Sequence, residues 1–230
     1  MPIPESQLET WSHQGATVTS SNTYRSIQTV LAAASSPISN KSYEVYLQGS
    51  YKNDTNIRGD SDVDVVVQLN ATFGYDLSGL DAEQRGYFAT SYPTNATYLF
   101  QNFRADVLRS LRQYYGQAAV SEGSKSLKLV AAPGRLAADI IPAIQHRKYN
   151  YFYGINGESH VEGIKLWTTN NLEVVNFPKD HYKNGVAKHA TNRTNGWYKP
   201  TVRMFKNART HLVDHGLLHD SVALHILLNA

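Results

Sequence analysis

Two carboxylates on one predicted strand are the residues of this chain best suited to chemistry. The segment DVDVVVQL at 62–69 is rich in β-branched residues, and the side chains of a strand alternate between its two faces. Asp62 and Asp64 therefore point to the same side, while the valines between and after them point into a core. Two neighbouring carboxylates repel each other unless a cation lies between them. Magnesium suits such a site, because it binds carboxylate oxygens and leaves positions for substrate phosphates.

A Gly-Ser pair precedes this strand. The alternating segment YEVYLQ at 43–48 predicts a strand that runs into Gly49 and Ser50, and eleven residues separate Ser50 from Asp62. A short helix that begins at Ser50 presents backbone N–H groups of the kind that bind phosphate. Gly49 has no Cβ, so the backbone there can approach an anion closely. The pattern indicates a phosphate-binding turn beside a metal-binding strand.

A third carboxylate lies in the apolar segment AADIIPA. In-line transfer of a nucleotidyl group usually uses two metal ions, which calls for a further ligand from a neighbouring strand. Asp139 can supply it, since an unpaired carboxylate between alanine and isoleucine is costly in a merely structural role. The alternative is an ion pair with Arg135 or Arg147.

These residues resemble a known superfamily. The stretches GSYKNDTNIRGDSDVDV and ADIIPA are similar to the Gly-Ser, Asp-x-Asp and distant third Asp of the polymerase-β-like nucleotidyltransferases. More narrowly, they resemble the bacterial cyclic-dinucleotide and oligonucleotide synthases (DncV-like), relatives of 2'-5' oligoadenylate synthetase and cyclic GMP-AMP synthase. The later stretch NFPKDHYKNGVAKHATNRTNGWYKPTVRMFKNAR resembles that family's link into its helical lobe. The likeness covers most of residues 10–215.

The resemblance implies a role for particular residues. Three of them would be metal ligands, two would contact phosphate, and a lysine of the helical lobe would reach the triphosphate. These are Asp62, Asp64 and Asp139 for the metal, Gly49 and Ser50 for the phosphate, and Lys206 for the triphosphate. The cofactor would be two Mg2+ ions, with Mn2+ as an alternative, and the substrates would be nucleoside triphosphates.

The implied function is synthesis of a cyclic or short linear oligonucleotide. As a second messenger it would activate an effector protein, in bacterial antiphage (CBASS-type) defence. Two other functions remain open at this point. One is a transferase that acts on tRNA or on a protein, as CCA-adding enzymes and antitoxin-type transferases do. The other is a nucleotide sensor that kept the fold without catalysis, which the three aspartates disfavour.

Periodicity predicts a mixed α/β (α+β) lobe followed by a helical lobe. Helices are expected at 22–34 and 96–116, and a hairpin within 125–145 turns at Pro133-Gly134. We divide the chain into a catalytic lobe at 1–178 and a helical lobe at 179–230. In the helical lobe an apolar stripe is expected along one helix, at Val202, Phe205, Ala208, Arg209 and Leu212. The final run SVALHILLNA has no cap or polar tail, which suggests that this lobe is truncated.

Composition limits the other possibilities. The 230 residues include no cysteine, so disulfides, thiolate metal sites and cysteine nucleophiles are excluded, and a cytoplasmic location is expected. No stretch is long and apolar enough for a membrane span. The 22 Lys and Arg are spread among 19 Asp and Glu, so we expect no nucleic-acid activator.

Two clusters of polar residues have simpler explanations than a site. His211, His215 and His219 follow at intervals of four residues, but HLVDH lacks the glutamate of the HExxH zinc motif, and a basic surface helix explains them as well. Arg109, Arg112, Lys125 and Lys128 would line an RNA groove only beside stacking aromatic residues. We interpret these four as a solvated face.

Overall fold

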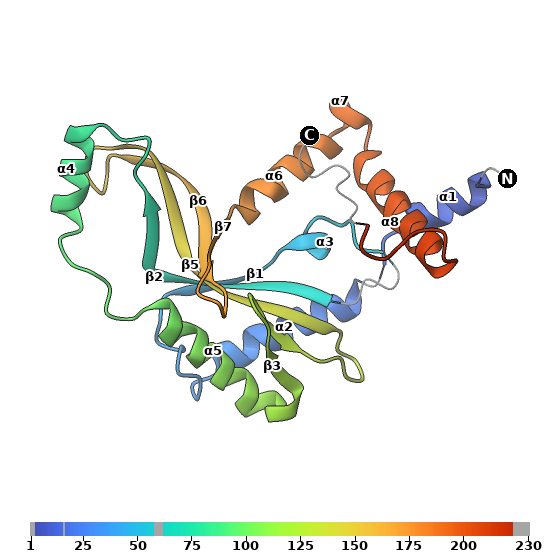
Figure 1. Cartoon of the computed structure of the whole chain (residues 1–230), viewed down its shortest axis with the longest axis horizontal. Coiled ribbons are helices and arrows are strands. Elements are labelled where there is room, and N and C mark those ends of the chain that lie inside the picture. Colours follow the sequence, from blue (N-terminus) through green and yellow to red (C-terminus); the bar gives the residue numbers. More distant parts are fainter. Residues whose placement is uncertain (1–2, 16, 58–61, 223–230) are drawn as a thin grey trace.

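A computed structural model of the chain describes residues 3–15, 17–57 and 62–222, in which seven strands form one mixed sheet flanked by helices (Figure 1). The strands are β1 (Tyr43–Leu47), β2 (Asp62–Asp76), β3 (Val120–Glu122), β4 (Leu127–Leu129), β5 (Ala137–Phe152), β6 (Glu158–Trp167) and β7 (Glu173–Asn176). The helices are α1 (Glu5–Ser12), α2 (Val18–Ala32), α3 (Gly49–Lys52), α4 (Ala82–Ser91), α5 (Phe100–Tyr115), α6 (Pro178–His189), α7 (Thr191–Thr194) and α8 (Tyr198–Asp214). The predicted mixed sheet with helices after it is confirmed.

The sheet is built around β2 and β5. Its order is β1-β2-β5-β4-β3, and β6 also pairs with β5 and then with β7. The β2–β5 pair is parallel and the other pairs are antiparallel. A parallel pair needs a long crossover, and here the crossover contains α4, α5 and the β3–β4 hairpin. The early part of β5 pairs with β4, as predicted for a hairpin at Pro133-Gly134, and its later part pairs with β6.

The main core lies between the sheet and the helices α2 and α5, which run side by side below the sheet in Figure 1. Val63 and Val65 of β2 are fully buried there against Ile27, Leu31 and Phe103. Each such side chain contributes about 1.5–3 kcal/mol of burial free energy. The two predicted helices are confirmed, although α2 begins four residues earlier and α5 four residues later than expected. No helix in the described ranges is long and apolar enough to cross a membrane.

The helices α6, α7 and α8 follow β7, and α1 joins them. Nδ2 of Asn207 in α8 donates to the carbonyl of Trp11 at 3.0 Å, and the Trp11 ring lies 5.6 Å from that of His211. Figure 1 shows α1 against α8, away from the sheet. We call α1, α6, α7 and α8 the helical part, and the sheet with α2–α5 the sheet body. The division at residue 178 stays a prediction, with the addition that α1 packs on the helical part.

The stripe predicted along α8 is partly wrong. Phe205 and Leu212 are 45% and 38% exposed, whereas the buried residue of this helix is Lys199, at 8%. The reason is that α8 meets the sheet body through charged residues, which an apolar pattern does not reveal. Most of the apolar run at 221–230 lies outside the described residues, and so does the prediction made from it.

Candidate active site

The turn after β1 lies directly against a carboxylate of β2. The backbone N–H of Gln48 donates to the carbonyl of Asp64 at 3.0 Å, which ties the end of β1 to the start of β2. Gly49 adopts φ +64°, and a Cβ built there would lie 2.1 Å from Oδ2 of Asp64. Only glycine therefore lets the turn come this close. The sequence predicts that Gly49 approaches an anion, and the anionic group beside it in this structure is the carboxylate of Asp64.

The short helix α3 begins at Gly49, one residue before the predicted start. Both the backbone N–H and Nδ2 of Asn53 donate to the carbonyl of Gly49, at 3.2 and 2.9 Å. The N–H of Thr55 donates to the carbonyl of Ser50 at 2.9 Å. The carbonyls of the turn are thus occupied, while N–H groups in the first turn of a helix have no partner within it. The groups of such a turn that can bind an anion are its backbone N–H groups.

The three predicted carboxylates lie on one face of neighbouring strands. In the parallel register of β2 and β5, Asp64 pairs directly with Asp139, and Asp62 precedes Asp64 by two residues. The alternate residues Val63 and Ala138 are buried on the core side. Neighbouring strands of a sheet lie about 4.7–4.9 Å apart. Strand register therefore brings Asp64 and Asp139 together, although they lie 75 positions apart in the chain.

The ion pairs proposed as the alternative role of Asp139 do not form with either arginine. Arg147 pairs instead with Glu158, and Arg135 donates to the carbonyl of Val130. The residue in register with Asp139 on its other side is Lys128 of β4, which is exposed. The sequence favours a solvated face for Lys128, and only the strand register places this residue next to the carboxylates.

The carboxylates suit a hard divalent cation in their chemistry. They offer oxygen ligands, which Mg2+ prefers. Because Gly49 has no Cβ, the space beside the Asp64 carboxylate stays open. Among the residues that the structure describes, no three His, Asp or Glu side chains converge as closely as a preformed metal site requires. The donor chemistry therefore fits magnesium, and the ligand set Asp62, Asp64 and Asp139 stays a prediction.

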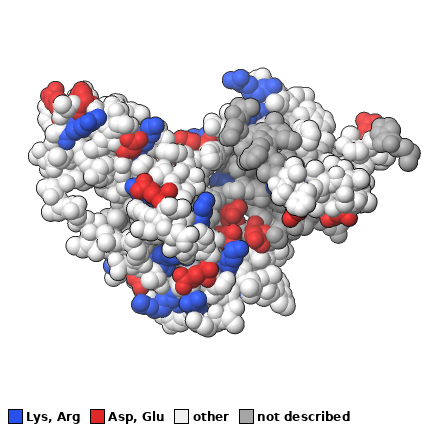
Figure 2. All heavy atoms as spheres, in the orientation of Figure 1, with Lys and Arg blue, Asp and Glu red and all other residues white. Residues whose placement is uncertain are grey.

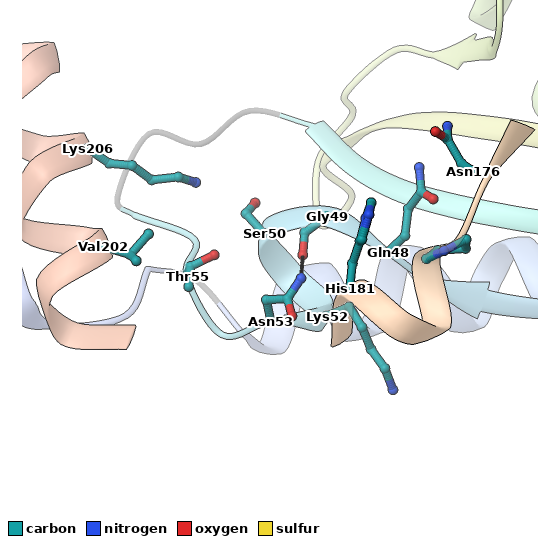
Figure 3. A pocket seen from close by; sticks show the side chains of 11 residues that line it. Gln48, Gly49, Ser50, Lys52, Asn53, Thr55, Asn176, His181, Val202 and Lys206 are labelled. Atoms are coloured by element: carbon teal, nitrogen blue, oxygen red, sulfur yellow. Dashed lines mark hydrogen bonds between the residues drawn. The ribbon is translucent and has the colours of Figure 1, made fainter. Parts of the chain in front are cut away.

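A pocket of about 310 Å³ opens beside the turn, between the sheet body and the helical part. Figure 2 shows acidic side chains gathered at the hollow between these two parts. The pocket is lined by Gln48, Gly49, Ser50, Lys52, Asn53, Thr55, Asn176, Pro178, His181, Val202 and Lys206. Figure 3 shows Lys206 extending from α8 toward Ser50. The structure thus brings Gly49, Ser50 and Lys206 to one pocket, and the carboxylates adjoin it through the contact of Asp64 with Gly49.

Several lining residues were not predicted individually. Gln48 and Asn176 lie at the end of the pocket away from Lys206, and His181 reaches toward the turn from α6 (Figure 3). Asn176 and His181 belong to the stretch NFPKDH, which resembled a family segment without a residue pattern that marks a ligand. Gln48 directly precedes the Gly-Ser pair. Its position next to that pair is the only feature of the sequence that could have marked it as a pocket residue.

The start of α6 is fixed to the sheet body by a charged cluster. Lys179 donates to Glu44 of β1 at 3.2 Å and also to Glu162 of β6. Burial would lower the pKa of Lys179, but hydrogen bonds to these carboxylates and their charges raise it above its usual value. Pro178 and His181 of the pocket flank this residue. The cluster therefore holds one wall of the pocket against the sheet.

The histidine metal site considered from sequence is not formed in the described part of the chain. Nδ1 of His215 lies 2.7 Å from the carbonyl of His211, and Nδ1 of His219 lies 2.7 Å from the hydroxyl of Ser221. Local contacts thus occupy one ring nitrogen of each of two histidines. Their spacing reflects a surface helix and its end.

Known proteins match both parts of the chain. Residues 29–112 match the family "nucleotidyltransferase domain", and residues 183–225 match "cGAS/DncV-like nucleotidyltransferase C-terminal helical domain". The cyclic UMP-AMP synthase of Rhodothermus marinus is 48% identical over 96% of this chain and 72% of its own length. The cyclic nucleotide synthase CdnE01 of Staphylococcus haemolyticus is 42% identical over 93% of this chain and 70% of its own length.

A solved structure agrees with these matches. The Rhodothermus marinus CdnE synthase with Apcpp and Upnpp has a TM-score of 0.80 at 47% identity, over 96% of this chain and 72% of that one. The matches of both parts of the chain and the likeness of the whole fold to this structure thus point to a single known type of protein. The chain is a member of the cGAS/DncV-like nucleotidyltransferases of the CdnE type, and it is a nucleotidyltransferase that makes cyclic dinucleotides.

Proposed function

We propose that this chain joins two nucleoside triphosphates into a cyclic dinucleotide with Mg2+ held by Asp62, Asp64 and Asp139. The observation that carries the proposal is the contact of the Gly49 turn with Asp64, at the edge of the pocket between the two parts of the chain. A phosphate on the turn would lie next to the carboxylates that bind its cation. This is the arrangement that nucleotidyl transfer needs.

In this proposal the donor nucleotide lies along the pocket. Its triphosphate lies on the N–H groups of the turn, near the Ser50 hydroxyl and the Lys206 ammonium (Figure 3). The base then lies at the opposite end, beside the carboxamides of Gln48 and Asn176. A carboxamide both donates and accepts hydrogen bonds, so it suits the edge of a nucleobase.

Positioning and charge neutralisation account for most of the catalysis expected here. When bound, the two ions would lower the pKa of the attacking hydroxyl and offset the charge of the triphosphate. Asp139 lies beside Asp64 in the strand register, so it can hold an ion next to the attacking hydroxyl of the acceptor nucleotide. Lys128 lies on the far side of Asp139 and can contact the phosphates of that acceptor.

The substrates proposed are UTP and ATP, because the Rhodothermus marinus relative is a cyclic UMP-AMP synthase. Purified protein would be incubated with an equimolar mixture of the four NTPs and Mg2+, without another acceptor, and the products analysed by mass spectrometry. We expect a phosphatase-resistant cyclic dinucleotide that contains one uridine and one adenosine. A product that forms only when RNA or a protein is added would contradict the proposal and favour a transferase with a macromolecular acceptor.

The aspartates are tested with a double replacement, Asp62→Asn and Asp64→Asn. We expect pyrophosphate release to fall by several orders of magnitude, as metal removal does in such sites, with an unchanged circular dichroism spectrum. The matched control is Asp180→Asn, a partly exposed aspartate of α6 paired only with its neighbour Lys183 among the described contacts. Full turnover in the folded double variant would exclude these residues. Tight NTP binding by the wild type without turnover would favour the sensor.

We propose further that the product is a second messenger that activates an effector protein in bacterial antiphage defence. This part rests on the resemblance of the Gly-Ser and Asp-x-Asp segments to messenger synthases. A host that carries the gene and its effector should survive phage infection, and the Asp62/Asp64 variant should remove that protection. Protection that persists in the variant would contradict the signalling role.

We propose that double-stranded nucleic acid is not the activator. The arginines considered for a groove have partners within the sheet body: Arg109 pairs with Asp106, and Arg112 donates to the carbonyl of Val120. Turnover should therefore be the same with and without double-stranded DNA or RNA, at low and at physiological salt. A tenfold stimulation that fades with added salt, on the order expected for several phosphate contacts, would show a basic groove instead.

A further inference from the structure

One face of α8 combines pocket residues with residues that hold the helix in place. Lys199, Val202, Arg203 and Lys206 follow the spacing of a single helical stripe. Val202 and Lys206 line the pocket. Lys199 and Arg203 contact Asp54, in the segment directly after α3. The same face of α8 thus contacts both the pocket and the loop that follows the Gly-Ser turn.

The contact between Lys199 and Asp54 is a partly buried ion pair. Nζ of Lys199 lies 2.7 Å from Oδ2 of Asp54, and the lysine side chain is only 11% exposed. Arg203 donates to the backbone carbonyl of Asp54 and to that of Ser12 in α1. Two cations of α8 therefore meet on one residue of the loop.

Asp54 is well placed to transmit this contact to the turn. Its backbone has φ +54°, in the left-handed region that residues other than glycine rarely adopt. The next residue, Thr55, is 8% exposed and donates its N–H to the carbonyl of Ser50. Both neighbours of Asp54 are hydrogen-bonded to the turn, since Asn53 donates to the carbonyl of Gly49 and Thr55 to that of Ser50. The position of Asp54 is thus coupled to that of Ser50.

We propose that Lys199 is a positioning residue for the donor triphosphate. By binding Asp54, it fixes the separation between Lys206 on α8 and the Gly49–Ser50 turn, the two groups that face each other across the pocket. Lys206 lies seven residues further along a rigid helix, about 10 Å from Lys199 along the helix axis. A displacement of α8 at Lys199 therefore also moves Lys206. The inference rests on the proposed function, since it assigns the pocket to a nucleotide.

The ion pair makes a specific prediction about single and double variants. Replacing Asp54 with Asn leaves the ammonium of Lys199 without its carboxylate at a site that is mostly removed from water, which is costly. Replacing both residues, with Lys199→Met, removes the uncompensated charge. The melting temperature should therefore be lowest in Asp54→Asn and higher in the double variant. A role of Lys199 that depends only on its size would not give this order.

The functional test separates affinity from chemistry. Variants Lys199→Met and Asp54→Asn/Lys199→Met would be compared with the wild type in steady-state turnover and in calorimetric titration with a nonhydrolysable NTP analogue and Mg2+. A lost positioning contact should raise KM and Kd by about tenfold while kcat changes by less than about twofold. The matched control is Lys183→Met, a lysine of the same helical part with a 76% exposed side chain. It should bind and turn over as the wild type does.

Each outcome decides the question. A wild-type KM and Kd in both folded variants would overturn the inference while leaving the proposed function intact. A loss of kcat without a change in affinity would also overturn it, since that result places Lys199 in the chemistry. If Lys199→Met does not fold, KM, Kd and kcat are measured on the double variant instead. If the wild type forms no product, the proposed function fails, and the titration with the analogue still tests the position of Lys199.

Discussion

Replacing Gly49 with alanine tests the contact on which the proposed site depends. The added Cβ would lie 2.1 Å from Oδ2 of Asp64, and contacts under 3.0 Å are not seen for real Cβ atoms. The oxygen therefore has to move by more than about 1 Å to reach 3.4 Å, where ordinary contacts begin. It belongs to the end of a short side chain, which can rotate away. The protein should fold with its Asp64 carboxylate displaced from the turn.

The expected effect on activity is larger than the effect on stability. A misplacement of about 1 Å in an active site can cost about 100-fold in rate. The left-handed backbone at φ +64° adds about 1–2 kcal/mol of strain for a residue with a side chain. In a protein of this size that corresponds to a fall of about 2–8 °C in melting temperature. We therefore expect kcat to fall by about two orders of magnitude in a protein that remains folded at 25 °C.

The matched control is Gly216→Ala. Gly216 has φ +69°, close to that of Gly49, but a Cβ built on it meets nothing within 4 Å. Gly216→Ala therefore introduces the same backbone strain as Gly49→Ala but no steric clash of the new Cβ with a neighbouring side chain. Pyrophosphate release and thermal melting would be measured for both variants. Turnover of Gly49→Ala within threefold of the wild type, or an equal loss in Gly216→Ala, would refute the reasoning that the Gly49–Asp64 contact sets the geometry of the site.

Two further predictions concern Lys128 and Glu162. Because Lys128 lies in register with Asp139, Lys128→Gln should raise the KM for the acceptor nucleotide by about tenfold. Its control, Lys125→Gln on the same hairpin, should leave this KM unchanged. Equal KM values for the two variants would exclude a contact between Lys128 and the acceptor. Burial would raise the pKa of Glu162, but hydrogen bonds from Lys179 and Gln68 outweigh it and lower the pKa below 4.5. The stability that this carboxylate contributes is therefore present above that pH and lost as the pH falls through the folded value. Melting temperatures from pH 7 to 3 should fall more steeply for the wild type than for Glu162→Gln, and parallel curves would contradict this.

The parts of the site that follow from local pattern were predictable from the sequence. The valine-rich strand after Asp62 and the turn at Gly49 each depend on a few neighbouring residues, and the structure contains both. The apolar setting of Asp139 indicated a strand, and it lies on β5. What pattern alone did not supply is the pairing of Asp139 with Asp64, because register between distant segments depends on the whole sheet. The assignment of Asp139 to the same site as Asp64 came from the family resemblance.

Other features depend on tertiary contacts that leave no period in the sequence. The strands β6 and β7 were missed, although β6 pairs with the later half of β5. The prediction for β2 ended at residue 69, whereas the strand continues to Asp76 after a register shift that begins at Leu69. On α8 an apolar stripe was expected, and the contacts with the sheet body are made instead by Lys199 and Arg203. From the sequence pattern alone, a buried lysine cannot be distinguished from a surface lysine, because the residue it pairs with is not known.

The site therefore consists of two halves that the fold fixes in different ways. Strand register places Asp64 and Asp139 together within the sheet body, independently of the helical part. Lys206 reaches the Gly49–Ser50 turn only because the helical part is fixed to the sheet body, by Lys179 at the start of α6 and by Lys199 on α8. Changes to the strand aspartates should then act on kcat, and changes to the anchors Lys179 and Lys199 should act on substrate affinity. If the two kinds of change are combined, their free-energy effects should add, because the anchors lie on α6 and α8 and the aspartates on β2 and β5.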